Sequence, residues 1–87
     1  MTKVTLLEFP CDFPVKMVGR AEEGFEALVL TIVERHAPDF DRATASSRLS
    51  RDGNFISVTC TILAENQAQL DMLYQELSDH ERVLMAL

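Results

Sequence analysis

The feature that most constrains the fold is a run of alternating residues from position 56 to position 64. Its apolar positions are Ile56, Val58, Cys60, Ile62 and Ala64, and they alternate with Ser57, Thr59 and Thr61. A period of two predicts a strand that is buried on one face, and β-branched residues favour its extended backbone. The turn signal Asp52-Gly53-Asn54 precedes the run, with a glycine available for a positive φ.

The first half of the chain predicts another strand and a helix. Phe13, Val15 and Met17 alternate with other residues and predict a strand that ends near Gly19. Helical spacing follows in Phe25, Leu28, Val29, Ile32, Val33 and His36. We place three glutamates, Glu22, Glu23 and Glu26, in the first turns of this helix, where they complement its dipole. Pro38 ends the helix because it biases the residue before it away from helical dihedral angles.

The second half predicts an edge strand, a helix and a last strand. Residues 42–51 are polar and rich in serine and threonine, as suits an exposed edge. Asn66, with Gln69 three residues later, resembles a capping box. The inner face of the helix that follows carries Leu70, Leu73, Tyr74 and Leu77. A short strand over residues 82–86 is expected to place Val83 and Met85 on one face.

The order of these elements is βαββαβ, which predicts an α+β fold. The right-handed crossover rule favours the ferredoxin-like plait, an antiparallel sheet of strand order 4-1-3-2. The first and third strands are then central, in agreement with their apolar character. We expect an N-terminal arm over residues 1–12, with Leu6, Leu7 and Phe9 docking on the domain, and one domain over residues 13–87.

Composition excludes several kinds of function. The formal net charge of −6 argues against a nucleic-acid partner and against binding to an anionic membrane surface. No apolar run approaches the roughly 20 residues of a membrane span, and the N-terminus does not resemble a signal peptide. His36 and His80 have no neighbour at ligand spacing, so no metal site is expected. Two cysteines form no disulfide framework, and we expect a cytoplasmic protein without a cofactor.

Two features suggest chemistry. Gly19 and Arg20 stand where the first strand meets the first helix, and a helix N-terminus favours anions. The same pair is also compatible with an ordinary strand-to-helix turn, in which Gly19 permits the change of direction. Cys11 lies in an expected loop beside Asp12, which would raise rather than lower the pKa of its thiol. Cys60 is expected to be a core residue.

The sheet face that carries no helix is the predicted partner surface. It includes Val18, Phe55, Thr59 and Leu84. Plaits that bind RNA carry stacking aromatic residues on this face, whereas here the third strand offers one, Phe55. Leu30 and Met72 lie off the apolar stripes of their helices, and this favours a homodimer or a contact with another protein. Scattered apolar surface residues are also normal in monomers.

Four stretches resemble a known family. LLEFPCDFPVKMVG, RHAP, GNFISVTCTI and LYQEL occur in the order found in the YbeD-like bacterial family of unknown function. The resemblance covers nearly the whole chain and implies a plait similar to the ACT-type regulatory domains of metabolic enzymes. Members are labelled lipoic-acid-binding regulators, and the family offers no catalytic residues. Residues 42–51 match its pattern least, so no ligand contact is assigned there.

Together these observations predict a non-enzymatic regulatory or binding module. Its ligand is a small metabolite, either lipoate-related or amino-acid-like, or its partner is a protein, such as a second copy or a metabolic enzyme. The alternative is a small enzyme that uses Cys11 or the Gly19-Arg20 turn for acyl or phosphoryl chemistry.

Overall fold

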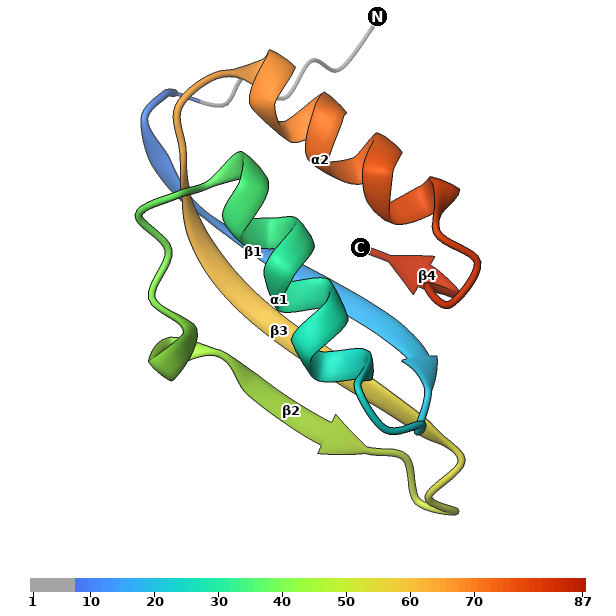
Figure 1. Cartoon of the computed structure of the whole chain (residues 1–87). Helices are drawn as coiled ribbons and strands as arrows, with labels where there is room; N and C mark the ends of the chain where they lie inside the picture. Colours follow the sequence, from blue (N-terminus) through green and yellow to red (C-terminus); the bar gives the residue numbers. More distant parts are fainter. Residues whose placement is uncertain (1–7) are drawn as a thin grey trace, which may run out of the picture.

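The computed structural model describes residues 8–87 as a four-stranded antiparallel sheet with two helices over one face (Figure 1). The elements in chain order are β1 (Cys11–Arg20), α1 (Phe25–His36), the 3₁₀ turn η1 (Arg42–Thr44), β2 (Ser46–Leu49), β3 (Phe55–Ala64), α2 (Gln67–Asp79) and β4 (Met85–Ala86). The sheet order is β2-β3-β1-β4, which is the predicted 4-1-3-2 read from the other edge. The predicted α+β ferredoxin-like plait is therefore confirmed.

The two central strands pair along their whole length, from Cys11 opposite Ala64 to Arg20 opposite Phe55. Alternation sends one set of side chains into the core, and Val15 in β1 is fully buried there. Strand β1 starts at Cys11, two residues before the expected start, so Cys11 lies in the sheet and not in a loop. Residues 1–7 of the expected arm, with Leu6 and Leu7, lie outside the described residues, while Phe9 packs against the core.

The helices bury the other half of the core. The buried helical residues are Phe25, Val29, Leu30, Ile32, Val33, Leu70, Leu73 and Leu77. The expectation that Leu30 lies off the apolar stripe is wrong, because α1 packs against both the sheet and α2 and so buries a wider arc. Met72 is 60% exposed, as predicted. None of the helices among residues 8–87 has the length and apolar character needed to cross a membrane.

The start of α2 is capped as predicted and is joined to the end of α1. The Gln69 backbone N–H donates to Oδ1 of Asn66 at 2.8 Å. The side chain of Gln69 accepts from the backbone N–H of Glu65 at 2.6 Å, one residue earlier than a standard capping box requires. Its amide also donates to the carbonyl of His36 at 2.7 Å, so one side chain connects both helix ends.

The start of α1 differs from the prediction. Gly24 precedes the helix in the left-handed region, with φ 87°, and no side chain caps the helix. Glu22 and Glu23 therefore come before the helix, and of the three expected glutamates Glu26 alone lies in its first turn. A positive φ favours glycine, and Gly24 supplies it at this turn, whereas Gly19 has no positive φ and lies within β1.

Both edge strands are shorter than predicted. Strand β2 has four residues, because Asp41 accepts from the backbone N–H of Ala43 at 2.9 Å and stabilises η1 in place of extended chain. Strand β4 has two residues, because the N–H of Val83 donates to His80 in a turn. Val83 faces the core whereas Met85 is 51% exposed, so the expectation that they share a face is wrong.

Gly19 has a packing role. It is buried in β1, and a Cβ there would overlap the ring of Phe25 and lie 2.6 Å from the carbonyl oxygen of Arg82. A residue without a side chain lets α1 and the C-terminal turn approach the strand closely.

Gly19→Ala is expected to destabilise the protein by about 1–3 kcal/mol through overpacking against Phe25, measured by urea unfolding. In the Gly19→Ala background, Phe25→Leu should lower the free energy of unfolding by less than it does in the wild type, because leucine leaves room for the methyl group of the new alanine.

Gly53→Ala is the matched control, because a Cβ at this position would have no atom within 4 Å and the cost of the change comes from a φ of +78°. The destabilisation caused by Gly53→Ala should simply add to that caused by Phe25→Leu, because the two positions do not interact. Equal stability of Gly19→Ala and the wild type would contradict the packing role.

Candidate functional site

The two residues of the predicted ligand site lie in different surroundings. Gly19 is buried beneath Phe25, whereas Arg20 is exposed and its guanidinium carbon is 5.8 Å from the centre of the Phe55 ring. Arg20 and Leu84 line the same open surface pocket of about 260 Å³. The structure thus brings Arg20 together with one residue of the predicted partner surface, whereas Gly19 does not line this pocket.

Some of the charged side chains that line this pocket form ion pairs and others do not. Nε of Arg82 is 3.7 Å from a carboxylate oxygen of Glu22, and Nη2 of Arg82 donates to the carbonyl of Glu23 at 3.0 Å. Glu81 also lines the pocket, and Arg20 forms no ion pair with any residue in the described part of the chain. Among the described residues, the pocket therefore holds one guanidinium group and one carboxylate without an ion-pair partner, Arg20 and Glu81, beside the apolar side chain of Leu84.

The open face of the sheet carries a row of exposed apolar side chains. Val18 lies opposite Ser57 on one side and Met85 on the other, and Thr59 lies opposite Lys16. The large exposed residues at or beside this face are Phe55 (36%), Leu63 (49%), Leu84 (54%), Met85 (51%) and Leu87 (61%). The face is defined here as these residues with Val18 and Thr59.

Sequence reasoning missed three members of the open face. Leu63 continues the alternation of Phe55 and Thr59 and could have been found from it. Met85 and Leu87 required knowledge of how the last strand pairs, since Leu87 exchanges backbone hydrogen bonds with Lys16.

The cysteines show no sign of activation. Burial, with a smaller contribution from the charge of Glu26, raises the pKa of the Cys60 thiol to about 11, and this thiol is fully buried in the core. Cys11 is half-buried opposite Ala64 and packs against the core. No group of three or more potential metal ligands occurs among residues 8–87.

A second cavity lies at the edge of β3, and no sequence pattern predicted it. Its volume is about 240 Å³, and its walls are the connection from α1 to β2, the end of β3 and the start of α2. The lining residues are Ala37, Pro38, Asp39, Phe40, Asp41, Thr44, Thr61, Ile62, Leu63, Glu65 and Gln69. These segments meet only in the folded chain. We call this space the edge cavity.

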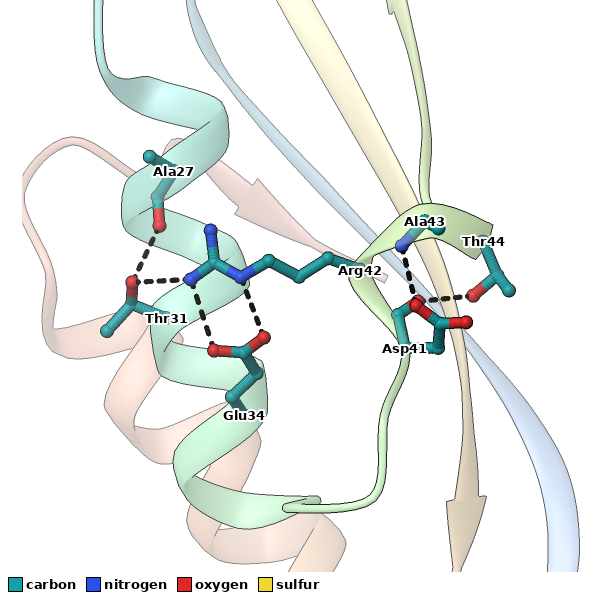
Figure 2. Close-up of polar contacts among 7 residues, drawn as sticks. All are labelled: Ala27, Thr31, Glu34, Asp41, Arg42, Ala43 and Thr44. Carbon is teal, nitrogen blue, oxygen red and sulfur yellow. Dashed lines mark hydrogen bonds and ion pairs between the residues drawn. The ribbon is translucent and has the colours of Figure 1, made fainter.

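The connecting segment is attached to α1 by Arg42 (Figure 2). Nε of Arg42 donates to Glu34 at 2.7 Å, and Nη2 donates to the other oxygen of the same carboxylate at 3.1 Å. Nη2 also donates to the hydroxyl of Thr31 at 3.1 Å, which in turn donates to the carbonyl of Ala27 at 2.9 Å. A bidentate arginine–carboxylate pair gives a defined geometry, so Arg42 holds this wall of the edge cavity.

Comparison with known proteins gives a family and a fold. A family described as a protein of unknown function (DUF493) matches residues 4–87. A UPF0250 protein of Nitrosomonas europaea is 52% identical over 87 residues, covering 100% of both chains. A UPF0250 protein of Neisseria meningitidis serogroup A is 42% identical over 85 residues, covering 98% of this chain and 93% of that one. The solution structure of protein HP0495 from H. pylori is similar, with a TM-score of 0.73, 13% identity and coverage of 99% of this chain and 90% of that chain.

The Arg42 pair predicts a pH dependence. The hydrogen bond from Arg42, together with its charge, lowers the pKa of Glu34 below its ordinary value. Arg42→Gln should raise the pKa of Glu34 towards that value, as measured by NMR titration of its carboxyl carbon. Because the folded pKa is the lower one, the stabilisation is present at neutral pH and is lost as the pH falls through the pKa of Glu34.

The stability difference between wild type and Arg42→Gln should therefore shrink on acidification. Arg48→Gln, on the exposed strand β2, is the control and should leave the titration of Glu34 unchanged. An unchanged Glu34 titration in Arg42→Gln would contradict the pairing.

Proposed function

This chain belongs to the DUF493 (UPF0250) family of bacterial proteins of unknown function, and we propose a function for it from the geometry of its surface. It is a non-enzymatic regulatory or binding module of the cytoplasm that contacts a partner protein through the open face of its sheet. The partner is a second copy of the chain or a metabolic enzyme.

The exposed apolar row is the observation that supports this proposal. The helices cover one side of the sheet, while Leu63, Met85 and Leu87 are 49%, 51% and 61% exposed on or beside the other. Met85 lies opposite Val18, and Leu87 follows two residues later, whereas Leu63 lies opposite Asp12 towards the other end of the sheet. Exposed apolar side chains that gather on one face often mark interaction sites. The hydroxyl of Thr59 and the charge of Lys16 interrupt the row, as is typical of a surface that must also stay soluble when unbound.

The rival enzyme, based on Cys11 or the Gly19-Arg20 turn, has less support. A nucleophilic thiol needs exposure and a nearby positive charge or base. Cys11 packs against the core within β1, and neither cysteine hydrogen-bonds to a basic side chain among the described residues. Gly19 packs against Phe25 within β1, so it does not form part of an open loop that binds an anion.

A small metabolite is a second candidate ligand, favoured by one observation. The pocket at Arg20 combines a guanidinium group with the exposed side chain of Leu84. A carboxylate attached to an aliphatic chain, as in lipoate or octanoate, would place its charge against Arg20 and its tail against Leu84. An amino acid with an apolar side chain offers the same pair of groups.

The partner proposal predicts that charge on the open face abolishes binding. The double variant Leu63→Lys and Met85→Lys should lose proteins that wild type captures from the native cell, identified by mass spectrometry, because buried unpaired lysines are costly at an interface. Met72→Lys, at a residue that is 60% exposed on α2, is the control for a single added lysine and should capture the same proteins as wild type.

Light scattering at micromolar concentration separates the two kinds of partner. A mass near the 9.8 kDa monomer would exclude self-association and leave a different protein. Capture of the same proteins by wild type and by the double variant would contradict binding through this face.

The metabolite proposal predicts heat in calorimetric titration with lipoate, octanoate or apolar amino acids. Arg20→Gln should weaken the binding roughly three- to tenfold, because it removes one exposed charge contact. Arg48→Gln, which removes an exposed arginine on β2, should leave the affinity unchanged. No heat from any of these compounds would leave only the protein partner.

A further inference from the structure

Strand β3 extends beyond the strand that pairs with it. Strand β2 pairs with β3 only from Ile56 to Thr59, whereas β3 continues to Ala64. On its other side β3 is paired with β1 over all ten residues. Within residues 8–87, the stretch from Cys60 to Ala64 thus has a strand neighbour on one side only.

The backbone groups that face this open side can be assigned from the hydrogen bonds. The N–H of Ser50 donates to the carbonyl of Phe55 at 2.8 Å, so the backbone groups of Phe55 point towards the β2 side. The direction of these groups alternates along a strand, and the register with β1 is continuous. The N–H and C=O groups of Thr61 and Leu63 therefore also point to this side, past the end of β2.

An independent contact on the far side of the sheet gives the same assignment. Lys16 exchanges backbone hydrogen bonds with Leu87, so the backbone groups of Lys16 point away from β3. The groups of Val15 then point towards β3 and pair with those of Cys60, its partner in the register. The groups of Thr61, one residue further on, must point to the open edge.

The edge cavity adjoins the stretch of β3 that has no strand neighbour on this side. Thr61 and Leu63 line it from β3, and Phe40 lines it from the connection between α1 and β2. Figure 1 shows this connection running out beyond the edge of β3 before it returns to β2. Arg42 attaches the connection to α1 through Glu34, on the side away from β3.

The charges around the edge cavity define its occupant. Asp39, Asp41 and Glu65 line the cavity, and its lining includes no lysine, arginine or histidine among the described residues. Carboxylates around backbone donors and acceptors favour an extended segment with basic side chains. A second copy of this chain, with a net charge of −6, is disfavoured at such a site.

We propose that the edge of β3 at Thr61 and Leu63 binds an extended, basic segment of a partner protein as an added strand. This inference rests on the proposed function as a protein-binding module. Backbone groups of the segment pair with those of Thr61 and Leu63, in the recognition mode in which a peptide extends a sheet. Its lysine or arginine side chains approach Asp39 and Glu65.

The test uses a defined peptide and the full chain. The probe is a five-residue peptide of alternating valine and lysine with blocked ends, titrated into ¹⁵N-labelled protein. We expect the amide resonances of Thr61, Leu63 and Phe40 to shift most. Hydrogen exchange at Thr61 and Leu63 should slow at least tenfold when the peptide is bound, whereas Ile62, whose N–H faces β1, should not change.

Matched variants test the contribution of charge. Asp39→Asn with Glu65→Gln should weaken the peptide roughly three- to tenfold, because two exposed charge contacts are removed. Asp79→Asn with Glu26→Gln makes the same change in net charge at exposed helix positions that line neither cavity, and it should have no such effect. A valine–glutamate peptide of the same length should bind more weakly than the valine–lysine peptide.

Three results would overturn the proposal: no shifts at millimolar peptide, shifts centred on the open face around Met85, or equal binding of the glutamate peptide. None of these results contradicts the proposed function, because that proposal is tested by which proteins the wild type and the Leu63→Lys, Met85→Lys variant capture. Loss of protein capture by that variant with no peptide bound at the edge would leave the function standing and remove this inference alone.

Discussion

The pairing of β1 with β3 is the interaction on which the other elements depend. Ten residues of each strand face one another, and both strands direct apolar side chains to the same side, where the helices bury them. Neither outer strand is as long as the central pair, so unpaired backbone remains beyond their ends. This also explains how a central strand accommodates Pro14. Its missing N–H falls on the β4 side, beyond the Lys16–Leu87 pair, where no partner strand requires it.

Sequence reasoning succeeded where a local pattern alone determines the structure. The alternation around Cys60 and the cap formed by Asn66 depend on neighbours in the chain, and both were predicted correctly. It failed where the local structure depends on a segment that is distant in the sequence. The length of β2 depends on where Asp41 stabilises a turn, and the burial of Leu30 depends on the position of α2. The role of Gly19 depends on the ring of Phe25, which local sequence cannot place against the strand.

The same distinction separates the surfaces that could be predicted from those that could not. Phe55 and Thr59 follow from strand alternation, and Leu63 belongs to the same set. The edge cavity combines residues of the α1–β2 connection with residues at the end of β3, and no local pattern links Asp39 to Glu65. The cavity depends on the late start of β2 at Ser46. The polar composition of residues 42–51 did not predict this start, because a polar sequence is equally compatible with an edge strand and with a turn.

Leu63 connects the two proposed surfaces. Its side chain belongs to the open face, whereas its backbone belongs to the edge of β3. A segment added at this edge would lie beside the apolar row, so one partner could pair with the backbone and also cover Leu63. The acidic lining has a second consequence, because an exposed sheet edge invites pairing between identical chains. Carboxylates at Asp39 and Glu65 repel another copy of this acidic chain while they attract a basic segment, so the same charges that permit selective binding also oppose edge-to-edge association.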